Sequence, residues 1–212
     1  MELSSIIYII KGIPITLEYT FISFLVGLFL GTIFSLAKLS KNKWLSNFVT
    51  VYVSIFRGTP ILVQLSIVYF VTPISMGYKI SIFESGIIAF SLNSAAYITE
   101  IIRAGIVSIN KGQFESARAL SVPYFYTMKD IILPQAIRNI LPALVNESIS
   151  LLKETAIISF FGVEDIMKRA DAISSARYEY LVPLLTAAAC YYVLVIALSA
   201  VARAIENRMK IA

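Results

Sequence analysis

Two glutamates within one long, mostly apolar stretch are the residues best suited to bind a ligand. Glu147 and Glu154 stand seven positions apart within residues 137–161. Seven positions are close to two turns of an α-helix, so both carboxylates would lie on the same face. A carboxylate binds an ammonium group through strong, charge-assisted hydrogen bonds. We therefore predict a site for a positively charged group on this face, with Glu154 as its first ligand and Thr155 beside it.

The cost of placing such charges in a membrane leaves an alternative open. An ionisable side chain at membrane depth costs about 2.5–3.5 kcal/mol on insertion scales, so it usually faces a cavity, a partner or another charge. For Glu154 the alternative to a ligand is a salt bridge, either to Lys153 of a neighbouring subunit or to Arg57.

A second group of polar residues surrounds a proline in another apolar stretch. Arg57, Thr59 and Pro60 lie near the middle of residues 48–71. Pro60 has no backbone N–H, so a helix would break there and free a carbonyl about one turn earlier. The break predicts a pathway lining, with Thr59 as the better pocket residue. The alternative is a kinked, packed helix in which Arg57 pairs with a carboxylate.

The third apolar stretch, residues 82–106, carries two further polar pairs. Asn93 and Tyr97 are four apart and share a helical face, which makes both candidates for the pocket. Glu100 and Arg103 are three apart, a spacing at which opposite charges become neighbours. We predict that these two form an internal ion pair.

Composition places the elements that hold these residues in a membrane. Of the 212 residues 58% are hydrophobic and only 15% are charged, which is too apolar for an ordinary soluble domain. Because the sequence contains no histidine, Ser-His-Asp catalysis and histidine-ligated metal sites are excluded. The single cysteine, Cys190, lies in an apolar run and predicts neither a disulfide nor a metal site. We expect an all-α, polytopic membrane protein with no cofactor and no enzymatic activity.

About five transmembrane helices are predicted, and the basic residues orient them. Lysines and arginines concentrate after the first stretch, between the third and fourth, and at the C-terminus. The positive-inside rule places these three regions in the cytoplasm and the N-terminus outside.

The segment of residues 162–183 carries both positive and negative charges without a basic excess, as an external surface helix or re-entrant helix would. Within the first stretch, Gly27 and Gly31 have a spacing that favours close helix contact. The predicted stretches are residues 14–37, 48–71, 82–106, 137–161 and 182–202.

One polar segment, residues 113–134, interrupts the apolar sequence on the predicted cytoplasmic side. Residues 111–120 favour a helix, Ser121-Val122-Pro123 breaks it, and residues 124–132 can form a second short helix. Its small side chains would allow another surface to approach, while Leu120 offers an apolar contact. The alternative is an amphipathic helix lying on lipid headgroups.

Three blocks of sequence stand out: YVSIFRGTPILVQ at residues 52–64, NSAAYITEIIRAGIVSINKGQFE at residues 93–115 and ILPQAIRNILPALVNESISLLKETAI at residues 132–158. Together they resemble the polar amino acid uptake permeases of ATP-binding-cassette importers. The polar segment resembles the EAA loop of these permeases, which docks on a cytoplasmic ATPase. The resemblance covers nearly the whole chain and implies a single permease domain, residues 1–212, of the type I importer fold, with residues 111–134 as its coupling loop.

The resemblance also implies partners. A binding protein outside the cell would deliver an amino acid, two permease subunits in the bacterial cytoplasmic membrane would form the path, and two ATPase subunits would power it. No G-x-x-x-x-G-K-[ST] phosphate loop is present, so ATP hydrolysis is expected on the partner chain. The alternative is an ion-gradient-driven secondary transporter or channel, which has no use for an ATPase-docking loop. The sequence leaves open whether the second permease is an identical copy.

Two positions depart from the EAA pattern. Ser116 replaces alanine, a mild change, and Ser121 replaces the glycine expected in the turn. A left-handed turn costs about 1 kcal/mol more for serine than for glycine, so either the turn differs or stability is lost.

The resemblance also bears on the substrate. Family members with different substrates share the triplet of a lysine, an acidic and a hydroxyl residue that contains Glu154 here. The triplet therefore indicates a polar substrate and leaves open whether that substrate is cationic. The resemblance implies that Glu115, Ser116, Ala117, Arg118, Leu120 and Ser121 form the ATPase-coupling surface.

Overall fold

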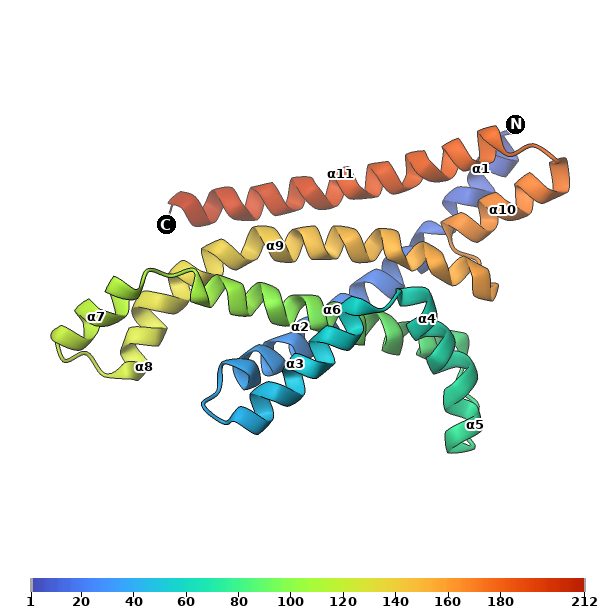
Figure 1. The fold of residues 1–212 in the computed structure, drawn as a ribbon. Coiled ribbons are helices and arrows are strands. Elements are labelled where there is room, and N and C mark those ends of the chain that lie inside the picture. The colour runs from blue at the N-terminus through green and yellow to red at the C-terminus, as the bar shows by residue number, and fades with distance from the viewer. Residues whose placement is uncertain (1, 212) are drawn as a thin grey trace.

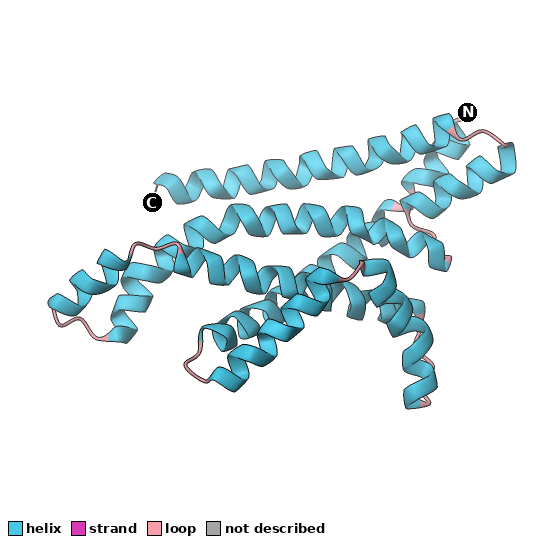
Figure 2. Cartoon of the chain, viewed as in Figure 1, coloured by secondary structure: helices cyan, strands magenta, loops and turns pink. Residues whose placement is uncertain are grey.

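A computed structural model describes residues 2–211, and all of its regular elements over that range are helices joined by short loops (Figures 1 and 2). The helices of the first half are α1 (Leu3–Ile10), α2 (Ile13–Leu39), α3 (Lys43–Gly58), α4 (Ile61–Ser66), the π-helical η1 (Ile67–Val71), α5 (Thr72–Met76) and α6 (Ile82–Val107). The second half contains α7 (Lys111–Ala119), α8 (Tyr124–Tyr126), the π-helical η2 (Thr127–Ile132), α9 (Leu133–Glu154), the 3-10 helix η3 (Thr155–Phe161), α10 (Ile166–Arg177) and α11 (Leu181–Ile211).

Three helical stretches among the described residues are long and apolar enough to cross a membrane by themselves. They are residues 3–39, α6 and residues 181–204. The third and fifth predicted stretches agree closely with α6 and residues 181–204, whereas the first, predicted at residues 14–37, begins eleven residues earlier. The second predicted stretch is divided: α3 and the helix that follows bend by 104° and together make up to one further span. The break lies at Thr59 and Pro60, so the prediction of a helix broken by the proline is confirmed.

The fourth predicted stretch is a long helix with a polar character. α9 has 22 residues, which at 1.5 Å per residue gives about 33 Å, enough to match a membrane core. It is not among the stretches apolar enough to qualify as a span, because polar residues and prolines lower its hydropathy together with the charged ones. It lies between α6 and α11 and packs on both (Figure 1). Two of its charged side chains, Glu147 and Glu154, are partly buried within the chain.

Small residues let α2 lie directly against α6. A Cβ added at Gly31 would lie 2.7 Å from Ile98 Cγ2 and 3.0 Å from the carbonyl oxygen of Ala95. The predicted close contact through Gly27 and Gly31 is thus confirmed, with α6 as the partner. This contact fixes α6, which carries Asn93, Tyr97 and Glu100.

The polar segment, residues 113–134, and the segment of mixed charge, residues 162–183, occupy opposite ends of the molecule (Figure 1). α7 and α8 lie at one end, toward which the α2–α3 connection and the C-terminus also point. The N-terminus and α10 lie at the other end. α10 packs there on α1 and α11 around Ile9, Ile166, Ala170 and Ala187. The three regions rich in basic residues therefore share one end.

Candidate functional site

A polar cavity of about 390 Å³ lies between α6 and α9. Both Glu147 and Glu154 line it, so the prediction that they share a helical face is confirmed. Tyr97 lines the cavity from α6. A cavity of this size falls in the range of small-molecule sites, and two carboxylates suit a ligand with one or two positive charges. Its remaining lining residues are Ile101, Ala143, Asn146 and Ser150.

A second cavity, of about 540 Å³, adjoins the first and brings in Arg57. The two cavities share Tyr97, Ile101 and Ala143. The Arg57 guanidinium carbon lies 5.0 Å from the centre of the Tyr97 ring, within the distance of a cation–π contact. Neither Arg57 nor Glu154 forms an ion pair among the described residues. The combined space therefore has a carboxylate region on α9 and a guanidinium on α3, with Tyr97 between them.

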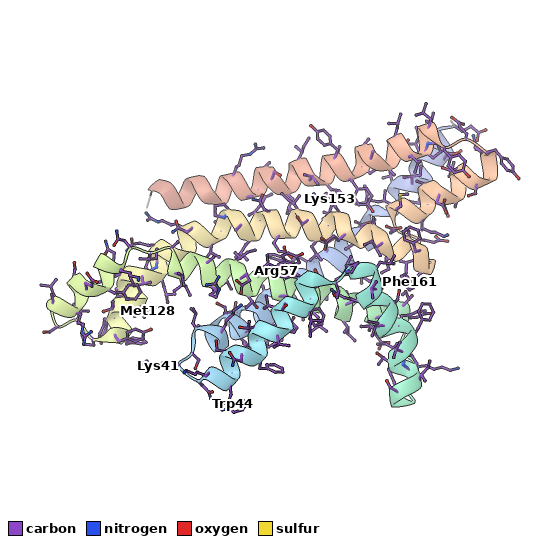
Figure 3. The ribbon with its side chains drawn as sticks, in the orientation of Figure 1. Lys41, Trp44, Arg57, Met128, Lys153 and Phe161 are labelled. Atoms are coloured by element: carbon purple, nitrogen blue, oxygen red, sulfur yellow. The ribbon has the colours of Figure 1, made fainter. Side chains whose placement is uncertain are left out.

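Lys153 faces away from this cavity. It lines a separate, mostly apolar pocket with α11 residues such as Ala187 and Tyr191. Figure 3 labels Lys153 between α9 and α11. Adjacent residues on a helix point about 100° apart, which accounts for the different surroundings of Lys153 and Glu154. The chain's own Lys153 therefore does not neutralise Glu154 by direct contact.

The break in the second span is stabilised by two side-chain amides. Pro60 cannot donate to the carbonyl of Phe56, four positions earlier. Gln64 Nε2 donates to this oxygen at 2.8 Å, and Asn93 Nδ2 donates to it at 3.1 Å. Gln64 Nε2 also donates to the Thr59 carbonyl at 3.0 Å, and Asn93 Nδ2 donates to Gln64 Oε1 at 3.0 Å. The freed carbonyl is thus satisfied inside the subunit rather than offered to a ligand.

Three of the predicted pocket residues consequently lie outside the acidic cavity. The Thr59 hydroxyl donates to the Ile55 carbonyl at 2.8 Å and accepts from Gln64 at 2.9 Å. Asn93 is buried and holds the broken helix. Thr155 is buried at the start of η3, where its hydroxyl donates to the Leu152 carbonyl at 2.8 Å. Their short polar side chains support the backbone around the site.

We expect Gln64→Leu to lower stability, because it removes the donor to the Thr59 carbonyl and one of the two donors to the Phe56 carbonyl. It also removes the oxygen that accepts from Asn93. A buried group that loses its hydrogen-bond partner costs about 1–3 kcal/mol. Thermal unfolding in detergent should show a midpoint several degrees below that of the unmodified protein. Gln113→Leu, the same change at an exposed position on α7, is the control and should leave the midpoint unchanged. Equal midpoints for the two variants would show that Gln64 does not support the break.

The predicted ion pair on α6 is present and has an additional member. Arg103 donates to Glu100 Oε2 from Nε at 3.1 Å and from Nη2 at 3.0 Å. Lys38, at the end of α2, donates to Glu100 Oε1. Sequence spacing was enough to predict the pair of Glu100 and Arg103 within one helix. Lys38 is 62 positions from Glu100, so only the tertiary structure shows that it joins them.

The polar segment forms the predicted helix, turn and second helix, with one correction to its surface. Glu115, Ser116, Arg118 and Leu120 are exposed on α7 or just after it. Ala117 is only 3% exposed, so its small side chain packs inside its own subunit and does not face an approaching partner. The expectation that Ala117 lies on the outer contact surface is therefore wrong.

Ser121 adopts the left-handed conformation that the turn requires, with a φ of 55°. The N–H of Val122 donates to the carbonyl of Ala117 at 2.9 Å, and the N–H of Ser121 donates to the carbonyl of Arg118 at 3.0 Å. This pair of bonds is the Schellman motif, which normally ends in glycine. The turn therefore keeps its shape despite the serine, and the expected cost falls on stability.

We expect Ser121→Gly to stabilise the end of α7 by about 1 kcal/mol, since glycine adopts positive φ without a Cβ clash. Amide hydrogen exchange in residues 111–123 should slow by about fivefold, which corresponds to that free energy. Ser116→Gly is the matched control, because it places glycine inside the helix and should speed the exchange. Faster exchange in both variants would contradict the strain at Ser121.

Comparison with known proteins gives one consistent family. The family model described as "Binding-protein-dependent transport system inner membrane component" matches residues 23–211. The putative glutamine transport system permease protein GlnP of Rickettsia bellii is 53% identical over 204 residues, covering 96% of this chain and 94% of the relative. The arginine transport system permease protein ArtQ of Bacillus subtilis is 48% identical over 206 residues, covering 96% and 93%.

Solved structures agree with the sequence relatives. The crystal structure of an amino acid ABC transporter with histidines contains a chain 40% identical to this one, with a TM-score of 0.88 and coverage of 95% and 94%. A chain of the inward-facing MetNI methionine ABC transporter shares the fold, with a TM-score of 0.82 at 19% identity and 99% coverage of both chains. The predicted importer permease fold is thereby confirmed. The chain belongs to the family of binding-protein-dependent transport system inner membrane components.

Proposed function

We propose that this chain is the membrane subunit of an ATP-driven importer of a polar amino acid, and that the cavity between α6 and α9 is its substrate site. The observation that carries the proposal is the placement of Glu147 and Glu154 in one cavity of about 390 Å³ on an importer permease fold. Two carboxylates match the α-ammonium group and a cationic side chain. Relatives include both a glutamine and an arginine permease, and the acidic cavity favours the cation.

Arg57 and Tyr97 complete the proposed site from the other side. A guanidinium binds a carboxylate with two parallel hydrogen bonds, and every free amino acid carries an α-carboxylate. We assign that role to Arg57, whose stack on Tyr97 keeps its charge beside the cavity. Thr59, Asn93 and Thr155 would act indirectly, by holding the backbone of α3 and α9.

The coupling role is assigned to residues 111–134 of a single permease domain, residues 1–212. Exposed Glu115, Ser116, Arg118 and Leu120 would contact an ATPase subunit, while Ala117 and Ser121 would shape the element. The three basic regions at the same end favour a cytoplasmic location for it, with the N-terminus outside. A second permease subunit, two ATPases and an extracytoplasmic binding protein would complete the assembly in the bacterial inner membrane.

Competition for uptake tests the proposed substrate class. Uptake of labelled arginine by the assembled importer should be inhibited by excess lysine or histidine and less by glutamine. Glutamate, which adds a negative charge to an already acidic cavity, should inhibit least. If glutamate competes as well as lysine, the two carboxylates are not the ligands of the substrate side chain.

A further inference from the structure

One buried hydroxyl on α6 donates to a carboxylate of the acidic cavity instead of to its own helix. Ser94 is 0% exposed, and its Oγ donates to Glu147 Oε1 at 2.8 Å. Serine and threonine hydroxyls in helices commonly donate to the carbonyl four positions earlier. On the same helix Ser85 and Thr99 do so, with distances of 2.9 Å and 2.6 Å. Ser94 differs from them because it crosses to α9.

The packing of α2 keeps Ser94 in this position. A Cβ added at Gly27 would lie 3.1 Å from Ser94 Cβ and 3.2 Å from Ser94 Oγ. The backbone of α2 thus lies immediately behind Ser94, which a side chain at position 27 would disturb. Gly27, Ser94 and Glu147 form a contiguous series from the first span to the cavity.

The two cavity carboxylates are therefore held differently. Glu147 accepts a hydrogen bond from a fully buried donor on a tightly packed helix. Glu154 lines the same cavity and forms no side-chain hydrogen bond with any side chain that the structure describes. A hydrogen bond to Oε1 restricts the Glu147 side chain and leaves Oε2 as its unoccupied acceptor. Ligand groups bind more tightly to acceptors that are already in place, because less side-chain freedom is lost.

We propose that Ser94 is a positioning residue for substrate, which fixes Glu147 as the rigid carboxylate of the site while Glu154 adjusts to the ligand. The inference rests on the proposed function, since it assumes that the cavity binds a cationic amino acid. Ser94 does not line the cavity, so its role in binding would be indirect. Its effect must therefore pass through Glu147.

Equilibrium binding of radiolabelled arginine to the purified permease–ATPase complex tests this role. Ser94→Ala removes a single oxygen, and we expect the Kd for arginine to rise about tenfold, as for a lost hydrogen bond to a charged group. Ser91→Ala is the matched control. Ser91 lies on the same helix, is 2% exposed, and its hydroxyl has no partner among the described residues. Its loss should leave the Kd unchanged.

A double-mutant cycle separates positioning from a general effect on packing. In a Glu147→Ala background there is no carboxylate to fix, so adding Ser94→Ala should change the Kd by less than about twofold. If the unmodified complex transports arginine but the Ser94 and Ser91 variants have the same Kd, the proposed role of Ser94 is wrong and the proposed function still holds. An equal loss from Ser94→Ala with and without Glu147 also overturns that role. Absence of ATP-dependent uptake by the unmodified complex would remove the proposed function and this inference together.

Discussion

Glu154→Gln is expected to lower arginine uptake by about 10- to 100-fold and glutamine uptake by less than about threefold. A hydrogen bond to a charged group contributes about 1.5–3 kcal/mol, and each 1.4 kcal/mol is a factor of ten. Glutamine is nearly the same size as glutamate, so the cavity keeps its shape while it loses one negative charge. Because Glu154 forms no ion pair among the described residues, the interaction lost in the variant should be the one with the ligand.

The measurement is ATP-driven uptake of both labelled amino acids into vesicles that contain the assembled importer. Glu18→Gln serves as the control, because it makes the same change at an exposed position of α2 and should alter neither rate. An equal loss of arginine and glutamine uptake in the Glu154 variant would favour a structural ion pair with a neighbouring subunit.

Glu115→Trp is expected to reduce transport more than tenfold while the ATPase subunits retain hydrolysis. Glu115 is exposed on α7, so a bulky side chain there would disturb a docked partner and leave the fold of the permease intact. ATP hydrolysis should therefore continue without driving transport. Both rates are measured on the same vesicles, together with arginine affinity, which should be unchanged.

Two further variants locate the effect on α7. Lys41→Trp introduces the same bulk in the exposed α2–α3 connection near that end of the molecule, and should leave transport unchanged. Ala117→Trp should instead destabilise the permease, since Ala117 is 3% exposed and packed within its own subunit. Full transport by the Glu115 variant would support the alternative of a helix that only lies on the membrane surface.

Much of the architecture could be predicted because it depends on short-range patterns. Apolar runs revealed the spans at residues 82–107 and 181–204 within two residues at each end, and Pro60 revealed the break in another. The first span was also revealed, but it begins at residue 3, eleven residues before the predicted start. A proline removes a donor wherever the helix runs, so this break requires no tertiary information. The shared face of Glu147 and Glu154 likewise follows from helical periodicity alone.

What the sequence did not reveal depends on contacts between distant segments. Gln64 looks like one more polar residue in a membrane stretch, and only the bend brings its amide to the Phe56 carbonyl. Ser94 is one of several serines on α6, and its bond to Glu147 spans 53 positions. Asn93 and Thr155 were predicted in the pocket because polar groups are costly in membranes, yet backbone carbonyls satisfy them. Periodicity identifies faces but not which neighbour each face meets.

Uptake of labelled arginine and glutamine into proteoliposomes tests the central claim most directly. The vesicles would hold this chain with its partner permease and ATPase subunits, and the binding protein would be added outside. The account predicts accumulation that requires ATP and is abolished when the ATPase subunits carry a hydrolysis-deficient substitution. Uptake at full rate without hydrolysis, driven by an ion gradient, would contradict it and identify a secondary transporter.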